Sequence, residues 1–179
     1  MTTPVTTWYL ELDSPDEVRP ATVPPPDAGV RIVRAGVPSA ELGRFLYTSV
    51  GADVSWTDRL PWPREQWQTH LEQPGRELWV AYEHGTPAGF VELDGLPEGP
   101  DEGVVEIAYF GLLPDFRGRG IGGHLLSYGA ARAWDLAGRW PGRPPTTRVL
   151  VNTCSLDGPH ALANYERRGF RVTNTTRSH

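Results

Sequence analysis

Cysteine and long apolar runs are nearly absent from this chain of 179 residues. A single cysteine is present, and it cannot form a disulfide within the chain. No apolar stretch reaches the ~18 residues of a membrane span, and the opening Met-Thr-Thr-Pro lacks the charged and apolar regions of a signal peptide. We therefore expect a reduced, soluble, cytoplasmic protein with no membrane partner.

Positive charge is also in short supply. The formal net charge is −5 and the isoelectric point is near 5.5. A nucleic-acid partner usually demands a basic face, so none is expected, and the acidic balance favours cationic substrates. Hydrophobic residues make up 39% of the chain, which at this length is enough for one substantial core and predicts one structural domain.

The most informative segment runs from Leu112 to Gly123, from the end of an apolar strand through two arginines and four glycines into a helix. The first N–H groups of a helix lack partners within it, and glycine lets a ligand approach them. The helix dipole and two guanidinium groups add positive charge. We predict that this turn binds the diphosphate of a nucleotide-bearing cofactor through Arg117, Gly118, Arg119, Gly120, Ile121, Gly122 and Gly123.

Two other kinds of phosphate-binding loop are also rich in glycine. A Walker A loop requires Gly-Lys before Ser or Thr, and residues 112–123 contain no lysine, which excludes it. Gly118-x-Gly120-x-x-Gly123 does fit the dinucleotide-binding pattern. That pattern also needs an acidic residue about 20 positions on, after the next strand, for the ribose. Here the next strand, 148–154, ends in Asn-Thr-Cys, so this alternative lacks its ribose ligand.

Two motifs in order resemble the GNAT N-acetyltransferase superfamily. Arg117-x-x-Gly120-x-Gly122, following an apolar strand and Pro114, is similar to its acyl-CoA pyrophosphate loop. Residues 161–170, Ala-Leu-Ala-Asn-Tyr-Glu-Arg-Arg-Gly-Phe, resemble its late helix, which ends in Tyr, a basic turn and Gly-Phe. With the strands around them, the resemblance covers roughly residues 76–175.

The resemblance implies a fold, a cofactor and a division of the chain. The fold would be a single-domain α/β structure with a mixed, mostly antiparallel sheet, helices on both faces, and a V-shaped splay between two central parallel strands. The cofactor would be acetyl-CoA, with the backbone of Phe110, Gly111 and Leu112 contacting pantetheine and the thioester carbonyl. Residues 30–179 would form the N-acetyltransferase domain, and 1–29 an N-terminal strand and proline-rich arm. No metal is expected.

Direct acetyl transfer needs a base to accept the amine proton and an acid to protonate the thiolate. Glu106 lies in an apolar strand eleven residues before Arg117, the position of the base in some family members. Strand alternation predicts that it shares a face with Ala108 and Phe110, whose apolar surroundings would raise its pKa. A solvent-facing glutamate is the alternative.

Tyr165 resembles the late-helix tyrosine that protonates the thiolate in many members of the family. A buried phenol can donate a hydrogen bond without ionising. The alternative is an ordinary helix aromatic that shares a packing face with Leu162.

The chain departs from the family at a pantetheine contact. The asparagine that many members carry seven residues before the late tyrosine is Gly158 here, so Asn152 or Asn164 is the expected replacement. Cys154 offers a covalent two-step alternative, although a lone cysteine is more often a small buried hydrophobe. His124 and His160 are expected to be structural or solvated.

Residues 56–62, Trp-Thr-Asp-Arg-Leu-Pro-Trp, combine aromatic and charged side chains suited to an amine pocket. Trp56, Asp58, Arg59 and Tyr109 are therefore the candidate acceptor contacts, and Arg59 points to an acceptor carboxylate. The alternative is a loop held down by its two tryptophans.

Together with these candidate residues, the resemblance implies N-acetylation of a small amine or amino acid in a ternary complex with acetyl-CoA. Acylation of a protein or peptide N-terminus and a non-catalytic acyl-CoA-binding module remain alternatives, and a homodimer is left open.

Local patterns also predict the elements. Strands are expected over 7–12, 30–34, 77–82, 89–93, 104–113, 148–154 and 170–173. Helices are expected after a Ser39 cap, near Pro63, over 121–136, and from a cap and first turn at Asp157 and Pro159 to Gly169. Residues 13–29 are a loop or mobile arm, and 93–103 an acidic turn.

Overall fold

The strands form one mixed sheet in the computed structural model, which describes residues 3–96 and 102–178. Within those residues the sheet has seven strands in the order β2-β3-β4-β5-β6-β1-β7. Only β5 and β6 are parallel neighbours, and the other pairs are antiparallel. The strands are β1 Val5–Leu12, β2 Val30–Arg34, β3 Arg76–Glu83, β4 Thr86–Gly95, β5 Val104–Leu112, β6 Arg148–Cys154 and β7 Arg171–Ser178.

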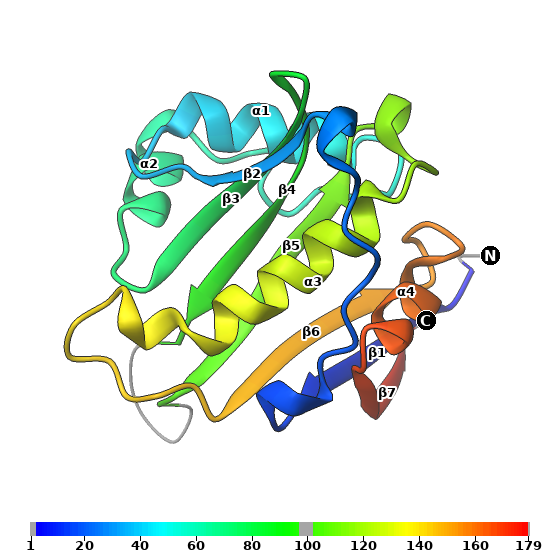
Figure 1. The fold of residues 1–179 in the computed structure, drawn as a ribbon. Coiled ribbons are helices and arrows are strands. Elements are labelled where there is room, and N and C mark those ends of the chain that lie inside the picture. The colour runs from blue at the N-terminus through cyan, green and yellow to red at the C-terminus, as the bar shows by residue number, and fades with distance from the viewer. Residues whose placement is uncertain (1–2, 97–101, 179) are drawn as a thin grey trace.

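Helices cover both faces of the sheet (Figure 1). On one face lie α1, Ala40–Gly51, and α2, Arg64–Leu71; on the other lie α3, Ile121–Trp134, and α4, Ala161–Arg167. The larger core forms between α3 and the sheet, where Leu125 and Leu126 are fully buried against Val91 and Leu93. A second core forms where α1 packs on β3 and β4. The expected mixed α/β architecture is confirmed.

The two central parallel strands part after a short paired stretch. Val104, Val105 and Glu106 of β5 pair with residues 148–150 of β6, and Glu106 opposite Leu150 is the last pair recorded in the described chain. Beyond that point both strands continue without pairing to each other, so their backbones separate between the two helical layers. This separation is the expected V-shaped splay.

An irregularity in β5 changes which side chains share a face. Glu92 of β4 pairs with Tyr109, but the next residue, Leu93, pairs with Ile107, which leaves the residue between them as an extra residue in β5. Such a bulge reverses the alternation of side chains beyond it. The prediction that Glu106 shares a face with Phe110 is therefore wrong.

Packing shows where each side chain of β5 lies. Phe110 contacts the core beneath α3, whereas Tyr109 contacts the clusters beneath α1 and α2. Glu106 lies on the same face as Tyr109, because the two residues pair with Asp94 and Glu92, which are two positions apart on β4.

Several element boundaries follow the predictions closely. Ser39 caps α1 by accepting a hydrogen bond from the Leu42 N–H at 3.2 Å, and Pro63 immediately precedes α2. The predicted cap at Asp157 is wrong, because its carboxylate accepts hydrogen bonds from Thr153 Oγ1 and the Cys154 N–H, and α4 begins later, at Ala161. Residues 97–101 of the expected 93–103 turn lie outside the described residues, and the final strand runs on to Ser178.

The proline-rich segment 13–29 crosses the face that carries α3 and α4 (Figure 1). It contains short 3-10 turns at Pro15–Glu17 and Pro26–Ala28. The Ala21 N–H donates to Ser127 Oγ in α3 at 2.8 Å, and the Arg19 N–H donates to the Arg168 carbonyl after α4 at 2.9 Å. The segment is thus a loop docked onto both helices.

The strand before this segment, β1, is the next-to-last strand at one edge of the sheet. β1 lies between β6 and β7 and pairs with both, so the strand earliest in the described chain separates the two latest. In residues 3–96 and 102–178, no helix has the length and apolarity needed to cross a bilayer.

Candidate active site

Among the residues that the structure describes, none accepts a hydrogen bond from the main-chain N–H groups at the start of α3, residues 121–123. Gly118 and Gly120 have positive φ values of 78° and 83°, which glycine adopts without strain. Gly120 is the N-cap of α3, and because glycine has no side chain it cannot cap the helix with a side-chain hydrogen bond. A Cβ built at either glycine meets no described atom within 4 Å, so the space in front of the turn is open. This geometry suits an anion.

The two arginines of the same turn are already paired. Arg117 binds Asp53 through Nη1 at 2.5 Å and Nη2 at 3.0 Å, and it also donates to the Leu112 carbonyl. Arg119 binds Glu83 at 2.7 Å and donates to the Asp115 carbonyl. The sequence does not predict these pairs. For either guanidinium to contact a phosphate, it would have to share or leave its carboxylate.

The end of β5 leads into this turn. Gly111 lies close beneath α1, because a Cβ there would be 2.5 Å from Val50 Cγ1. Leu112 is buried and pairs with Gly89 of β4, and its carbonyl is held by Arg117 as described above. Phe110 to Leu112 belong to the part of β5 that has left β6, so one edge of this backbone faces the splay.

Glu106 lies among other carboxylates on the α1/α2 face. Its direct cross-strand partner is Asp94, and Glu92 lies two residues before Asp94 on β4. Burial, followed by the charges of Asp94 and Glu92, raises the pKa of Glu106, while Arg59 and Arg76 act in the opposite direction. A carboxylate in these surroundings holds a proton more readily than usual, as a general base requires.

Tyr165 lies on the other face. It is 7% exposed, and its ring packs edge-on against Phe110 at 6.1 Å and Phe170 at 5.9 Å between centroids. Burial, assisted by the charge of Asp157, raises the pKa of Tyr165, so its phenol keeps its proton. Glu106 and Tyr165 therefore occupy opposite faces of the sheet, on the two sides of the splay.

The four predicted acceptor residues meet around Tyr109. The Trp56 ring lies 4.8 Å from the Tyr109 ring, and the Arg59 guanidinium lies 4.5 Å from its centre. The Tyr109 hydroxyl donates to Asp58 at 3.5 Å. These residues come from β5 and from the loop between α1 and α2, so the tertiary fold assembles them into one cluster.

Arg59 has a structural partner that the sequence did not reveal. It is 8% exposed, and Nη1 and Nη2 both bind Glu92, at 2.8 and 2.7 Å. The rings of Trp62 and Tyr109 flank its guanidinium. Both terminal nitrogens of the guanidinium therefore already bind Glu92. A carboxylate of the acceptor could contact Arg59 only through N–H groups that do not face Glu92.

Asn152 and Asn164 are both exposed, but they belong to elements that present them differently. Val149 and Val151 of β6 face the core beneath α3, so alternation directs Asn152 to the opposite face from α4, which carries Asn164. Asn152 and the helix that carries Asn164 therefore lie on opposite faces of the sheet. Cys154 is a half-buried free thiol at the end of β6, and burial lowers the pKa of His124.

Four residues in or beside the acidic group around Glu106 are not singled out by any sequence motif: Glu92, Asp94, Arg76 and His70. His70 Nε2 lies 3.4 Å from both Glu92 carboxylate oxygens, and Arg76 binds Asp94 at 2.7 Å. A signal was present, because alternation along β4 puts Glu92 and Asp94 on one face.

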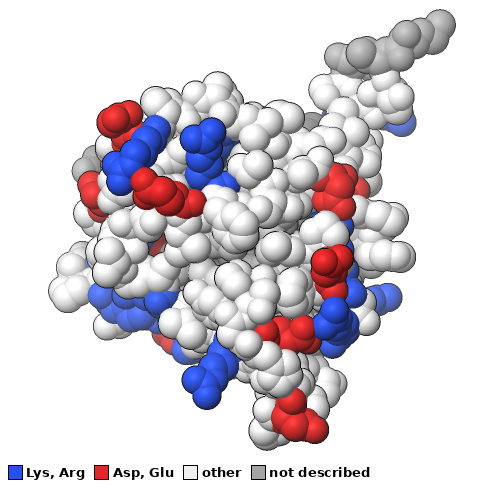
Figure 2. Space-filling view, turned by 90° about the horizontal axis from the view of Figure 1, so that it is seen from above, with Lys and Arg blue, Asp and Glu red and all other residues white. Residues whose placement is uncertain are grey.

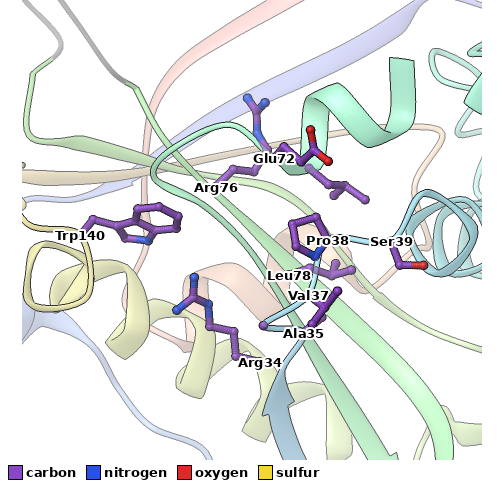
Figure 3. A pocket seen from close by; sticks show the side chains of 11 residues that line it. Arg34, Ala35, Val37, Pro38, Ser39, Glu72, Arg76, Leu78 and Trp140 are labelled. Carbon is purple, nitrogen blue, oxygen red and sulfur yellow. The ribbon is translucent and has the colours of Figure 1, made fainter. Parts of the chain in front are cut away.

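Two hollows border the acidic group formed by Glu92, Asp94 and Glu106, and Arg76 lines both. An open one of about 540 Å³ runs along α2 and reaches His70 and Arg76. A smaller one of about 90 Å³, shown in Figure 3, lies between Pro38, Leu78 and Trp140, with Arg34 stacked 5.3 Å from the Trp140 ring. Trp140 follows the C-terminal end of α3, so the smaller hollow is remote from the glycine turn.

Charged side chains are dispersed over the end of the molecule seen from above. Figure 2 shows acidic and basic groups there in small mixed clusters around a largely uncharged centre. The pairing of Arg117 with Asp53 and of Arg119 with Glu83 accords with this mixture.

Solved structures share this fold. A GCN5-related N-acetyltransferase from Kribbella flavida is 21% identical, with a TM-score of 0.64 over 95% of this chain and 55% of that one. Another from Sphaerobacter thermophilus is 19% identical, with a TM-score of 0.61 over 96% and 49%. A tandem GNAT protein from the clavulanic acid biosynthesis pathway is 18% identical, with a TM-score of 0.58 over 98% and 54%. The chain spans about half the length of each.

Sequence comparison identifies the family. No curated protein matches the chain. The model of the acetyltransferase (GNAT) family matches residues 44–170, which include β5, the glycine turn, α3, β6 and α4. This match covers well over half of the chain and contains both motifs described above. The chain therefore belongs to the GNAT acetyltransferase family.

Proposed function

We propose that the protein transfers the acetyl group of acetyl-CoA to the primary amine of a small molecule or amino acid, with both substrates bound at once. The observation that carries the proposal is the position of the splay. It separates Glu106 on the α1/α2 face from Tyr165 on the α3/α4 face, and the uncapped turn of α3 follows the same strand. A donor and an acceptor approaching from opposite faces would meet there.

The residues around the turn fit coenzyme A. The open space at Gly118 and Gly120 and the uncapped start of α3 suit a diphosphate, and the free edge of β5 at Phe110 to Leu112 suits the pantetheine amides. When bound, the cofactor supplies an acetyl thioester that an amine can attack. Main-chain groups carry most of this binding, because Arg117 and Arg119 are held by carboxylates.

The chain's own residues provide the proton transfers. Glu106 accepts a proton from the incoming ammonium group, and its raised pKa keeps it near the working range of a base. On the opposite face, the raised pKa of Tyr165 keeps its phenol protonated, so that it can donate the proton to the departing thiolate. The acidic face formed by Glu92, Asp94 and Glu106 favours a cationic acceptor, and the loop packed around Tyr109 favours a small one.

An amine-library screen that measures thiol release from acetyl-CoA tests the proposal. Because the sequence contains no lysine, the enzyme has no side-chain amine of its own, and self-acetylation adds little background. We expect turnover on small amines or amino acids, and we expect Glu106→Gln to lower it by about 100- to 10,000-fold. Turnover on peptides alone would favour a peptide N-terminal acetyltransferase. Binding of acetyl-CoA without turnover on any amine would favour a binding module.

A further inference from the structure

Three carboxylates share one face of β4 and β5, those of Glu92, Asp94 and Glu106. Glu92 and Asp94 each bind an arginine, Arg59 and Arg76, at 2.7 Å. Within residues 3–96 and 102–178, the Glu106 carboxylate makes no hydrogen bond or ion pair. It stands directly opposite Asp94 in the register of the two strands. Like charges at directly opposed positions of a sheet repel each other.

From this arrangement, and resting on the proposed function, we propose that Asp94 and Arg76 are positioning residues for the reaction. Their ion pair sets the pH range in which Glu106 accepts a proton from the acceptor amine. Asp94 places a negative charge across the strand from Glu106, and Arg76 offsets part of it.

Other groups also face Glu106. On β4, Glu92 contributes a second negative charge, which the paired Arg59 guanidinium offsets, and His70 Nε2 lies 3.4 Å from the Glu92 carboxylate. On β6, Leu150 is the paired residue, and Arg148, two positions earlier, binds Glu11 of β1 at 3.4 Å. Asp94, directly opposite Glu106, and its partner Arg76 both have partly exposed side chains, at 19% and 15%. Both can therefore be changed without leaving a fully buried charge.

The position of Arg76 makes the pair sensitive to its surroundings. Its guanidinium also donates to the His70 carbonyl at the end of α2 at 3.0 Å, and the residue lines both hollows beside the acidic face. An acceptor entering along α2 would pass this pair on its way to Glu106. The pair thus links the acceptor's route to the charge on the base.

Two opposite substitutions test the proposal through the pH dependence of kcat/KM. Asp94→Asn removes the opposing charge, so the acid limb should move down by about 0.5 to 1 pH unit. Arg76→Gln leaves Asp94 unpaired, so the limb should move up by a similar amount. Arg76→Lys keeps the charge and should restore the wild-type limb. Glu41→Gln removes a carboxylate from an exposed pair with Arg64 on α1 and should leave the limb unchanged.

A direct titration separates this inference from the proposed function. The carboxyl carbon of Glu106 can be followed by NMR in protein labelled with ¹³C-glutamate and identified by its loss in Glu106→Gln. If Asp94→Asn and Arg76→Gln shift the Glu106 titration in opposite directions, the effect of the ion pair on Glu106 is supported. If the protein also turns over no amine, the proposed function is overturned although that effect remains. Equal titrations in wild type, Asp94→Asn and Arg76→Gln would overturn the inference, and so would a change in kcat with no movement of the acid limb.

Discussion

At the scale of single residues, Glu106 is the most direct test of catalysis. Its raised pKa means that the ionised form is disfavoured in the folded protein, so wild-type kcat/KM should fall as the pH drops through that pKa. Glu106→Gln should lower kcat/KM by about 100- to 10,000-fold near neutral pH, as loss of a general base does. Steady-state rates across a pH series, together with calorimetric binding of acetyl-CoA, provide the measurement.

The same variant carries its own control for folding. A group whose pKa is raised by folding stabilises the protein below its unfolded pKa, and that contribution is lost as the pH rises. Glu106→Gln should therefore unfold at the same temperature as wild type or a slightly higher one at pH 7. A lower melting temperature with weaker acetyl-CoA binding would indicate a structural glutamate.

Tyr165 allows a second test at this scale. Tyr165→Phe keeps the ring and its contacts with Phe110 and Phe170, so only the hydroxyl is lost. Turnover should slow by roughly ten- to a thousandfold if the phenol is the general acid. Single-turnover rates with acetyl-CoA measure this, and rates equal to wild type would reduce Tyr165 to a packing residue.

Residue identities could be predicted from the sequence more easily than residue partners. The side chains of Trp56, Asp58, Arg59 and Tyr109 were predicted to act together, and the fold gathers them around one ring. The ion pairs of Arg59 with Glu92 and of Arg117 with Asp53 could not be predicted, because their members are separated by whole elements and a short motif does not specify its distant partners.

At the scale of elements, the backbone conformation of the glycine turn before α3 should affect both the stability of the protein and its affinity for acetyl-CoA. Gly120 has a φ of 83°, where a side chain costs about 1–2 kcal/mol, although a Cβ there meets no described atom within 4 Å. Gly120→Ala should therefore lower stability by about that amount and weaken acetyl-CoA binding through a displaced turn. Chemical unfolding and calorimetry measure the two effects.

A matched glycine outside the turn serves as its control. Gly142 has a φ of 90° and an equally open Cβ position in the loop after α3. Gly142→Ala should cost similar stability and leave acetyl-CoA affinity unchanged. Equal affinities in both variants would contradict a role for the turn in holding the cofactor.

Regular elements follow from local pattern, and irregular ones do not. Apolar and β-branched runs predicted strands such as 148–154, which agrees with β6 at both ends. The bulge in β5 escaped prediction because it is defined by the register with β4, and no residue in the strand signals it. That single irregularity decides that Tyr109, and not Phe110, shares a face with Glu106.

At the scale of the whole molecule, the Arg59–Glu92 pair should govern acid stability. Burial alone would raise the pKa of Glu92, but hydrogen bonds from Arg59 and His70 outweigh it and lower the pKa to about 2. Because the folded pKa lies below the unfolded one, this group stabilises the protein above about pH 4.5, and that stability is lost as the pH falls toward 2.

Arg59→Met tests this dependence. It leaves a buried carboxylate without its main partner and should cost about 3–5 kcal/mol at pH 7. The deficit should shrink toward pH 4, as Glu92 takes up a proton. Urea unfolding at both pH values measures it, with Arg64→Gln on the exposed α1–α2 pair as a control expected to show little change at either. A deficit independent of pH would mean that Arg59 acts through packing alone.

The placement of β1 also constrains how the chain reaches its native state. Thr7 pairs with Cys154, and Val5 pairs with Ser178, so the partners of β1 are translated only after nearly all of the other described elements. Contacts between segments so distant in sequence form slowly, and until they form an unpaired strand exposes backbone N–H and C=O groups without partners. During synthesis, β2 to β5 can assemble with α1 to α3 while β1 waits for its neighbours. Closure of the sheet around β1 is therefore expected to be a late event in folding.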